Sequence, residues 1–318
     1  MNKNLNLFTI ITLFVYHLYI FIYEMVTLKK FILFTVCGIS SFSYADLPLT
    51  VENIIAEQGK TTLELGLTYG NNKISDTSVG GYIPVQIADT SFVNVPTFIN
   101  DEKIQNEFLI ASIGAKYGIV KNLDISLRSN FLYKSNRYLS TETHEASSSD
   151  TDLVDISLGA NYQFLQDAKH PALVGFIETT AVEKGEHKNS YFSDWTLGFT
   201  TYRSYDPIVL SLTSGYKYSE KREIDQNQDY KPADLFFLNP QIAFAANDRI
   251  SLIGGFNFKS SGDQKINNRV IEKKRNNLDY SFGIGYGVSD QSNLNITATM
   301  RQEFDNSSEI RLNYSKNF

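Results

Sequence analysis

The feature that most constrains this chain is an alternation of apolar and polar residues in segments of roughly ten residues. The clearest segments are 123–133, 153–164 and 278–288. A period of two places successive side chains on opposite faces of a β-strand. About ten residues is also the length of a strand that crosses a bilayer. The pattern therefore predicts strands with one face toward lipid and the other toward a polar interior.

Counting such segments predicts about twelve strands, an even number as in bacterial outer-membrane barrels. They are expected near 60–70, 105–118, 122–135, 152–165, 172–184, 192–204, 207–219, 234–246, 249–260, 277–288, 293–304 and 309–318. The longer connections between them are 71–104, 136–151, 185–191, 220–233 and 261–276. The shorter ones are 118–122, 166–171, 204–207, 245–248 and 289–292, with 305–308 short where a long one is due.

This alternation of long and short connections is typical of bacterial outer-membrane proteins, which have long outer loops and short periplasmic turns. The predicted fold class is all-β: a transmembrane, antiparallel, up-and-down β-barrel spanning 60–318 in the bacterial outer membrane. A closed barrel satisfies every backbone hydrogen bond, so it can sit in lipid without an open edge. Tyrosines near predicted strand ends suit interfacial girdles, namely Tyr69, Tyr117, Tyr133, Tyr162 and Tyr218.

The first 45 residues are read as a leader. Residues 25–45 have two lysines, an apolar run and a small-x-small ending, which is typical of a secretory signal peptide cleaved between Ala45 and Asp46. Residues 1–24 are interpreted as lying upstream of the true start at Met25, and the alternative is a transmembrane anchor at 7–23. The mature chain would hold no cysteine, since Cys37 lies in the leader.

The last segment, 308–318, ends on an aromatic residue and alternates cleanly. We expect Tyr314 and Phe318 on its lipid side, as a signal for the barrel-insertion machinery. Lys316 shares that face and can extend its ammonium group to the interface. A β-sandwich that happens to end on phenylalanine is the alternative.

Charged residues of both signs fall on the predicted inner faces. They are Glu64, Asp124, Arg128, Asp155, Glu178, Asp194, Arg203, Lys217, Asp279, Arg301, Glu303 and Arg311. Such a lumen is either a hydrated channel or filled by ion pairs. A barrel of this size has room for a narrow pore, so we expect a partly occluded pore lined by these residues.

Two segments could occlude that pore. Residues 46–59 have a capping threonine, Thr50, and a terminating glycine, Gly59, which predict a short helix. This segment is expected either at the periplasmic mouth or in the lumen as a plug, or else as a free leader. The loop segment 80–99 is unusually apolar. We expect it to continue the barrel as a hairpin above the membrane, with a constriction inside the barrel or a partner contact as alternatives.

No enzyme signal is present, and no cofactor or metal site is expected. His17 lies in the leader, and His144, His170 and His187 lie in predicted loops without a nucleophilic triad or metal-ligand spacing. The glycines of 283–287 lie within a strand and form no dinucleotide fingerprint. The net charge of −6 argues against a nucleic-acid partner. The charge runs 220–223 and 272–275 are expected to be solvated loop faces.

Three stretches carry a family resemblance: "DLPLTVENIIAEQGK" (46–60), "YDPIVLSLTSGYKY" (205–218) and "YKPADLFFLNPQIAFAANDRISL" (230–252). The chain resembles outer-membrane transporter barrels of the meta-pathway phenol degradation-like family. Some members look like barrels of pilus-assembly or functional-amyloid systems, in which the barrel exports the fibre subunit. Those exporters carry a long coiled coil before the barrel, whereas this chain has only the short segment 46–59.

The resemblance implies a transport or secretion channel for a pilus or fibre subunit. Our first hypothesis is such a channel, gated by 46–59 or by the loop 71–104. The second hypothesis is a passive porin for small, even apolar, solutes. The third is a non-conducting outer-membrane protein that anchors or assembles a partner through its loops. A channel predicts ion conductance and an anchor predicts none.

Overall fold

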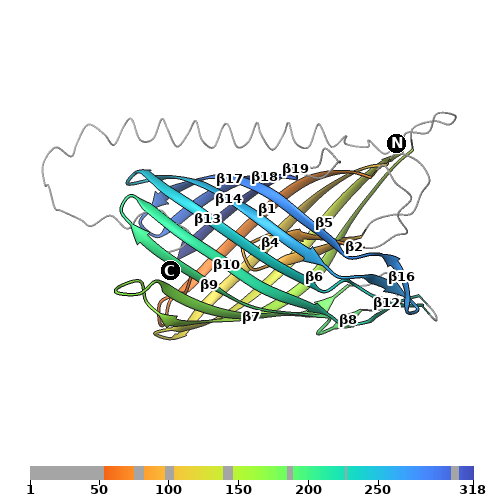
Figure 1. Cartoon of the computed structure of the whole chain (residues 1–318), viewed down its shortest axis with the longest axis horizontal. Helices are drawn as coiled ribbons and strands as arrows, with labels where there is room; N and C mark the ends of the chain where they lie inside the picture. The colour runs from red at the N-terminus through yellow and green to blue at the C-terminus, as the bar shows by residue number, and fades with distance from the viewer. Residues whose placement is uncertain are drawn as a thin grey trace, which may run out of the picture. The chain divides into compact units, whose positions relative to one another are not determined.

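A computed structural model of the chain describes residues 54–74, 82–96, 104–138, 146–184, 189–225, 228–301 and 308–318 (Figure 1). Twelve long strands in these ranges pair antiparallel with their neighbours and close into a barrel. They are β1 (Thr61–Ile74), β4 (Ile104–Val120), β5 (Leu123–Tyr138), β6 (Ala146–Leu165), β7 (Ala172–Glu183), β9 (Asp194–Tyr205), β10 (Ile208–Ser219), β13 (Leu235–Asn247), β14 (Ile250–Ser261), β17 (Arg275–Ser289), β18 (Ser292–Arg301) and β19 (Ser308–Asn317). The predicted twelve-stranded barrel is confirmed.

The first and last strands form the seam of the barrel. Thr62 pairs with Asn317 and Asn71 pairs with Ser308, so β1 and β19 match along almost their whole length. The backbone N–H of Phe318 donates to the carbonyl of Thr61 at 2.9 Å, which extends the pairing to the last residue of the chain. The circle is completed by the pairing of β6 with β7.

The outer face of the barrel is an apolar belt. Leu197 is 65% exposed, Phe164 60% and Phe282 58%, although each lies on a strand flanked by two others. Such side chains are stable on a barrel surface only against lipid, so the fold is that of an outer-membrane barrel. Among the expected girdle tyrosines, Tyr117, Tyr162 and Tyr218 are exposed on this belt. No helix within the described ranges has the length and apolar character needed to cross a membrane.

The two ends of the barrel differ. At one end the strands are joined by short turns, and β1 starts and β19 finishes there. At the other end lie five short strands, β8 (Ser190–Tyr191), β11 (Arg222–Asp225), β12 (Gln228–Lys231), β15 (Gln264–Ile266) and β16 (Arg269–Glu272). Figure 1 shows β8, β12 and β16 gathered there, away from the C terminus. By analogy with other outer-membrane barrels, the end with short turns is periplasmic and the other is the outer end.

Two of the long connections contain more structure than expected. β11, β12, β15 and β16 form a four-stranded sheet, in which Tyr230 of β12 pairs with Ile266 of β15. The segments 220–233 and 261–276 were predicted only as long connections between membrane strands. They nonetheless pair with each other, since two neighbouring hairpins at the same end of a barrel can join edges.

Candidate functional site: the lumen and its hairpin

The loop between β1 and β4 carries a hairpin of β2 (Tyr82–Gln86) and β3 (Phe92–Pro96) that packs inside the barrel. Val85 and Val93 are completely buried against Phe108 and Ile110 of β4 and Leu132 of β5. The expectation that this apolar segment extends the barrel above the membrane is therefore wrong. Its apolar side chains pack on an apolar patch on the inner face of β4 and β5, because burying both surfaces removes apolar area from water.

The hairpin also reaches a second wall of the lumen. The Phe92 ring lies 4.9 Å from that of Phe237 of β13, and Phe237 lies 6.5 Å from Phe176 of β7. These three side chains form one buried cluster with Leu235. The hairpin is thus wedged across the lumen between β4–β5 and β7–β13, held by apolar contacts on both sides.

Polar contacts hold the tip of the hairpin. Ser91 donates to the Glu178 carboxylate of β7 at 2.7 Å, and Arg128 of β5 donates to Ser91. Asn239 of β13 donates to the backbone carbonyl of Asp89, and Arg311 of β19 donates to that of Gln86. We call residues 86–91 the hairpin tip; it contacts strands around most of the barrel.

Arg128 and Glu178 also belong to an ion network with Glu64 and Lys116, here called the mid-lumen network. The Glu64 carboxylate is 2.6 Å from Lys116 and 3.3 Å from Arg128, and Arg128 is 3.4 Å from Glu178. Glu64, Arg128 and Glu178 were predicted from their place on inner faces. Lys116 was not, although it lies two residues from Gly114, which pairs with both Glu64 and Arg128.

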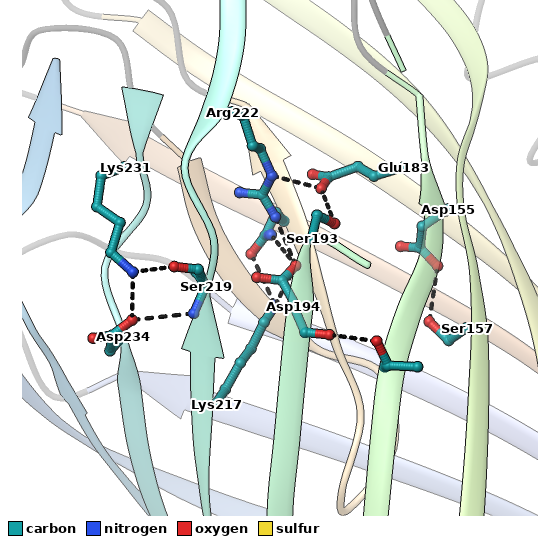
Figure 2. Close-up of polar contacts among 12 residues, drawn as sticks. Asp155, Ser157, Glu183, Ser193, Asp194, Lys217, Ser219, Arg222, Lys231 and Asp234 are labelled. Carbon is teal, nitrogen blue, oxygen red and sulfur yellow. Dashed lines mark hydrogen bonds and ion pairs between the residues drawn. The ribbon is translucent and has the colours of Figure 1, made fainter. Parts of the chain in front are cut away.

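A second buried group, the outer ion cluster, lies near the outer end (Figure 2). Arg222 of β11 reaches Glu183 of β7 at 2.6 Å and Asp194 of β9 at 2.7 Å, and Lys217 of β10 lies 3.4 Å from Asp194. Asn94 of the hairpin donates to Asp194 at 3.2 Å and accepts from Lys217 at 3.3 Å. The outer ion cluster therefore joins the hairpin, three barrel strands and β11.

Arg222 corrects one expectation. The run 220–223 was predicted to be a solvated loop face, yet Arg222 is only 5% exposed. Two carboxylates lie within ion-pair distance of its guanidinium, which offsets the cost of removing the charge from water. Glu183 was not among the predicted inner-face charges. It is the last residue of β7, where the alternation ends and no longer shows which face a side chain occupies.

The N-terminal segment 54–60 closes the periplasmic end. The backbone N–H of Ala56 donates to Asp124 of β5 at 2.9 Å, and that of Gly59 donates to the Gly118 carbonyl at 2.8 Å. Ile54 packs against a buried cluster that includes Tyr202 and Val209. Residues 54–60 contain no helix, so the expected helix does not reach this far; 46–53 lie outside the described residues. The described part of the segment is held by the barrel and is not a free leader.

Between the two closures lies a chamber of about 220 Å³. Ile54 lines it from the periplasmic side, and residues 86–90 of the hairpin tip line it from the outer side. Most of its wall consists of Ser, Thr, Asn and Gln side chains, together with the mid-lumen network. A second hollow of about 400 Å³ is lined by 54–58, Lys121 and Gln163. The chamber therefore lies between residue 54 and the hairpin tip, and most of its lining residues are polar.

The predicted inner-face residues do not form a single site. Glu64, Arg128, Glu178 and Arg311 line the chamber, and Asp194 and Lys217 belong to the outer ion cluster. Four of the others are local partners inside the barrel: Asp124 accepts from Ala56 and Asn161, Asp155 accepts from Asn130, Asp279 pairs with Lys259, and Arg301 pairs with Glu309. The prediction is wrong for Arg203: it pairs across β9 and β10 with Leu210 of the apolar belt, so it lies on the outer face, where it pairs with Asp167. Glu303 lies outside the described residues.

The two residues predicted as an insertion signal, Tyr314 and Phe318, lie at the seam of the barrel. Tyr314 pairs across the seam with Leu65, which is exposed on the lipid belt, and Phe318 is 61% exposed. Ala45 and Asp46 lie outside the described residues. The cleavage site and the insertion signal stay predictions.

The fold has known counterparts among outer-membrane proteins. An outer membrane channel from Pseudomonas putida F1 aligns with a TM-score of 0.56 at 12% identity, covering 88% of this chain and all of that one. The translocator domain of the autotransporter NalP from Neisseria meningitidis aligns with a TM-score of 0.50 at 9% identity, covering 85% of this chain and 92% of that one. No protein-family model matches the chain, and no curated protein matches it in sequence. The likeness is one of fold.

Proposed function

We propose that this protein is a gated outer-membrane channel for small solutes, closed in the described conformation by the β2–β3 hairpin and the segment 54–60. The observation that carries the proposal is the hairpin itself, which blocks the lumen while leaving a polar chamber behind it. The Pseudomonas channel of similar fold supports the same reading.

The contacts of the hairpin suit a gate. Its tip is held by hydrogen bonds to Glu178, Asn239 and Arg311. On opening, water can replace each of them, at a net cost of about 0.5–1.5 kcal/mol for the neutral bond of Asn239 and about 1.5–3 kcal/mol for each bond to a charged group. The apolar contacts of Val85 and Val93 favour the closed state, because opening would expose them and the patch beneath.

Export of a pilus or fibre subunit is the second candidate, and it follows from the family resemblance. Passage of an unfolded chain would require both the hairpin and the segment 54–60 to leave the lumen, because residues of both line the chamber. In a deletion strain, loss of the fibre would support export, and intact fibres would count against it.

Single-channel conductance in planar bilayers tests the proposed function. Four proteins are compared: the parent, a variant with 82–96 replaced by a Gly-Ser linker, a variant lacking 46–59, and a variant with both changes. We expect a mostly closed parent, frequent openings in the hairpin variant and the largest, steadiest current in the double variant.

The matched control replaces Gln264–Glu272 by a linker, because these residues lie at the same end of the barrel but in the outer sheet. It should conduct like the parent. Silence of the double variant, from protein shown to be folded by its heat-dependent mobility on gels, would end the channel proposal. Steady conductance of the parent would favour an ungated porin.

A further inference from the structure

The wall of the chamber formed by β18 and β19 is built for hydrogen bonding. Thr297 pairs with Arg311 and Asn295 pairs with Asn313, so these four inner-face residues form a two-by-two patch. All four line the chamber. The apolar contacts of the hairpin lie instead on β4, β5, β7 and β13. Among the described residues, the hairpin contacts this patch only through the hydrogen bond from Arg311 to the Gln86 carbonyl.

Several polar atoms around the chamber have no hydrogen-bond partner within the described protein. They are the Nε of Arg311, the Oδ1 of Asn295, the Oγ of Ser281 and the Oε1 of Gln86. Buried polar atoms are nearly always paired in folded proteins. Four of them among the lining residues, both donors and acceptors, can pair with water or with a polar solute that offers both kinds of group.

The charges of the chamber single out Arg311. Lys116 and Arg128 are neutralised by Glu64 and Glu178 in the mid-lumen network. Arg311 forms no ion pair among the described residues and donates only to the Gln86 carbonyl.

Two acidic side chains act on Arg311 by charge, Asp89 and Glu309. Glu309 is held by Arg301 at 2.7 Å. Asp89 lies on the hairpin tip, is exposed and lines the same chamber. When the hairpin leaves, Asp89 leaves with it, and the positive charge of Arg311 is no longer offset on that side.

We propose that the chamber binds a small hydroxylated carboxylate, such as a sugar acid, with its carboxylate on Arg311 and its hydroxyls on Asn295, Asn313 and Thr297. A guanidinium matches a carboxylate with two parallel hydrogen bonds, and a single arginine without an ion-pair partner among the described residues suits a monoanion. A chamber of about 220 Å³ is smaller than a typical drug-sized pocket, which favours a solute the size of one sugar. This inference rests on the proposed function and names the solute class of the same lumen.

Calorimetric titration of the full, refolded barrel in detergent tests the site, with sodium gluconate as probe. Glucose has the hydroxyls without the charge, and acetate has the charge without the hydroxyls. We expect gluconate to bind and both controls to bind about tenfold more weakly or worse, the loss expected when one charge-assisted contact or several neutral ones are missing.

Variants locate the binding. Arg311→Gln should weaken gluconate binding by about tenfold or more, while Arg311→Lys should retain part of it. Asn295→Asp should also weaken it, because it adds a negative charge beside the carboxylate without changing side-chain size. Asp89→Asn should strengthen it, since it removes the competing charge at the hairpin tip. Equal binding of gluconate and glucose, or undiminished gluconate binding by both folded variants Arg311→Gln and Asn295→Asp, would overturn the site.

The test separates this inference from the proposed function. If the hairpin variant conducts but gluconate binding does not depend on Arg311, the channel stands and the site is wrong. If gluconate binds through Arg311 but no variant conducts, the site stands and the channel is wrong.

Discussion

At the scale of single residues, Asp124 is the anchor of the periplasmic closure. It is completely buried and accepts hydrogen bonds from the backbone N–H of Ala56 and the side chain of Asn161. A hydrogen bond to a charged group contributes about 1.5–3 kcal/mol. Asp124→Ala should therefore speed hydrogen exchange at the Ala56 amide by roughly tenfold to a hundredfold. Exchange followed by NMR in detergent micelles measures it.

The matched control is Asp167→Ala. Asp167 also lies at the periplasmic end and accepts from the backbone N–H of Ser204 at 2.8 Å, but it does not touch the segment 54–60. The Ala56 amide should exchange as in the parent. An unchanged rate in Asp124→Ala would mean that Ile54 and the backbone bonds of Gly59 hold the segment by themselves.

At the scale of elements, the β2–β3 hairpin should be released by one buried charge. Val93 is completely buried between the hairpin and the inner wall. Val93→Asp places a carboxylate there without a partner, which costs several kcal/mol, so the open probability should rise by about tenfold or more. The same change at Val270, which is 43% exposed in the outer sheet, should leave the open probability unchanged. Single-channel recording distinguishes the two, and equal opening of both would show that docking of Val93 does not control the gate.

The sequence was enough to predict the strands of the barrel, but it was not enough to predict the position of the β2–β3 hairpin. The alternation that predicted twelve strands is a local property of the sequence, so the predicted strand bounds agree with the structure to within a few residues. The largest difference is at β6, which begins at Ala146 and not at 152. The hairpin was recognised as apolar and then placed above the membrane. Its true position depends on pairs such as Asn94 with Asp194, which are 100 residues apart and leave no periodic trace. The burial of Arg222 was missed for the same reason.

At the scale of the whole molecule, the last residue should matter more for assembly than for stability. Phe318 is 61% exposed on the lipid side, and its backbone closes the seam through Thr61. Phe318→Ala keeps that backbone bond but removes the predicted insertion signal. The fraction of heat-modifiable barrel in outer-membrane preparations should fall severalfold. The melting temperature of the refolded protein should stay close to that of the parent.

Phe282→Ala is the control for this prediction, because Phe282 is 58% exposed on the same apolar belt but lies within β17. Its assembly should match that of the parent. A similar loss in both variants would assign the effect to general lipid contact rather than to recognition of the last strand.

The contacts of the hairpin also determine the order in which parts of the structure form during assembly. Its tip contacts Asn239, 150 residues after Asp89, and Arg311, 225 residues after Gln86. These partners exist in place only when β13 and β19 have joined the wall. The apolar contacts with β4 and β5 can form earlier, but the hydrogen bonds of the tip require the complete barrel wall. Each newly inserted barrel would then conduct until its hairpin tip is bound. A cell that makes this protein quickly would therefore have a more permeable outer membrane for a short time.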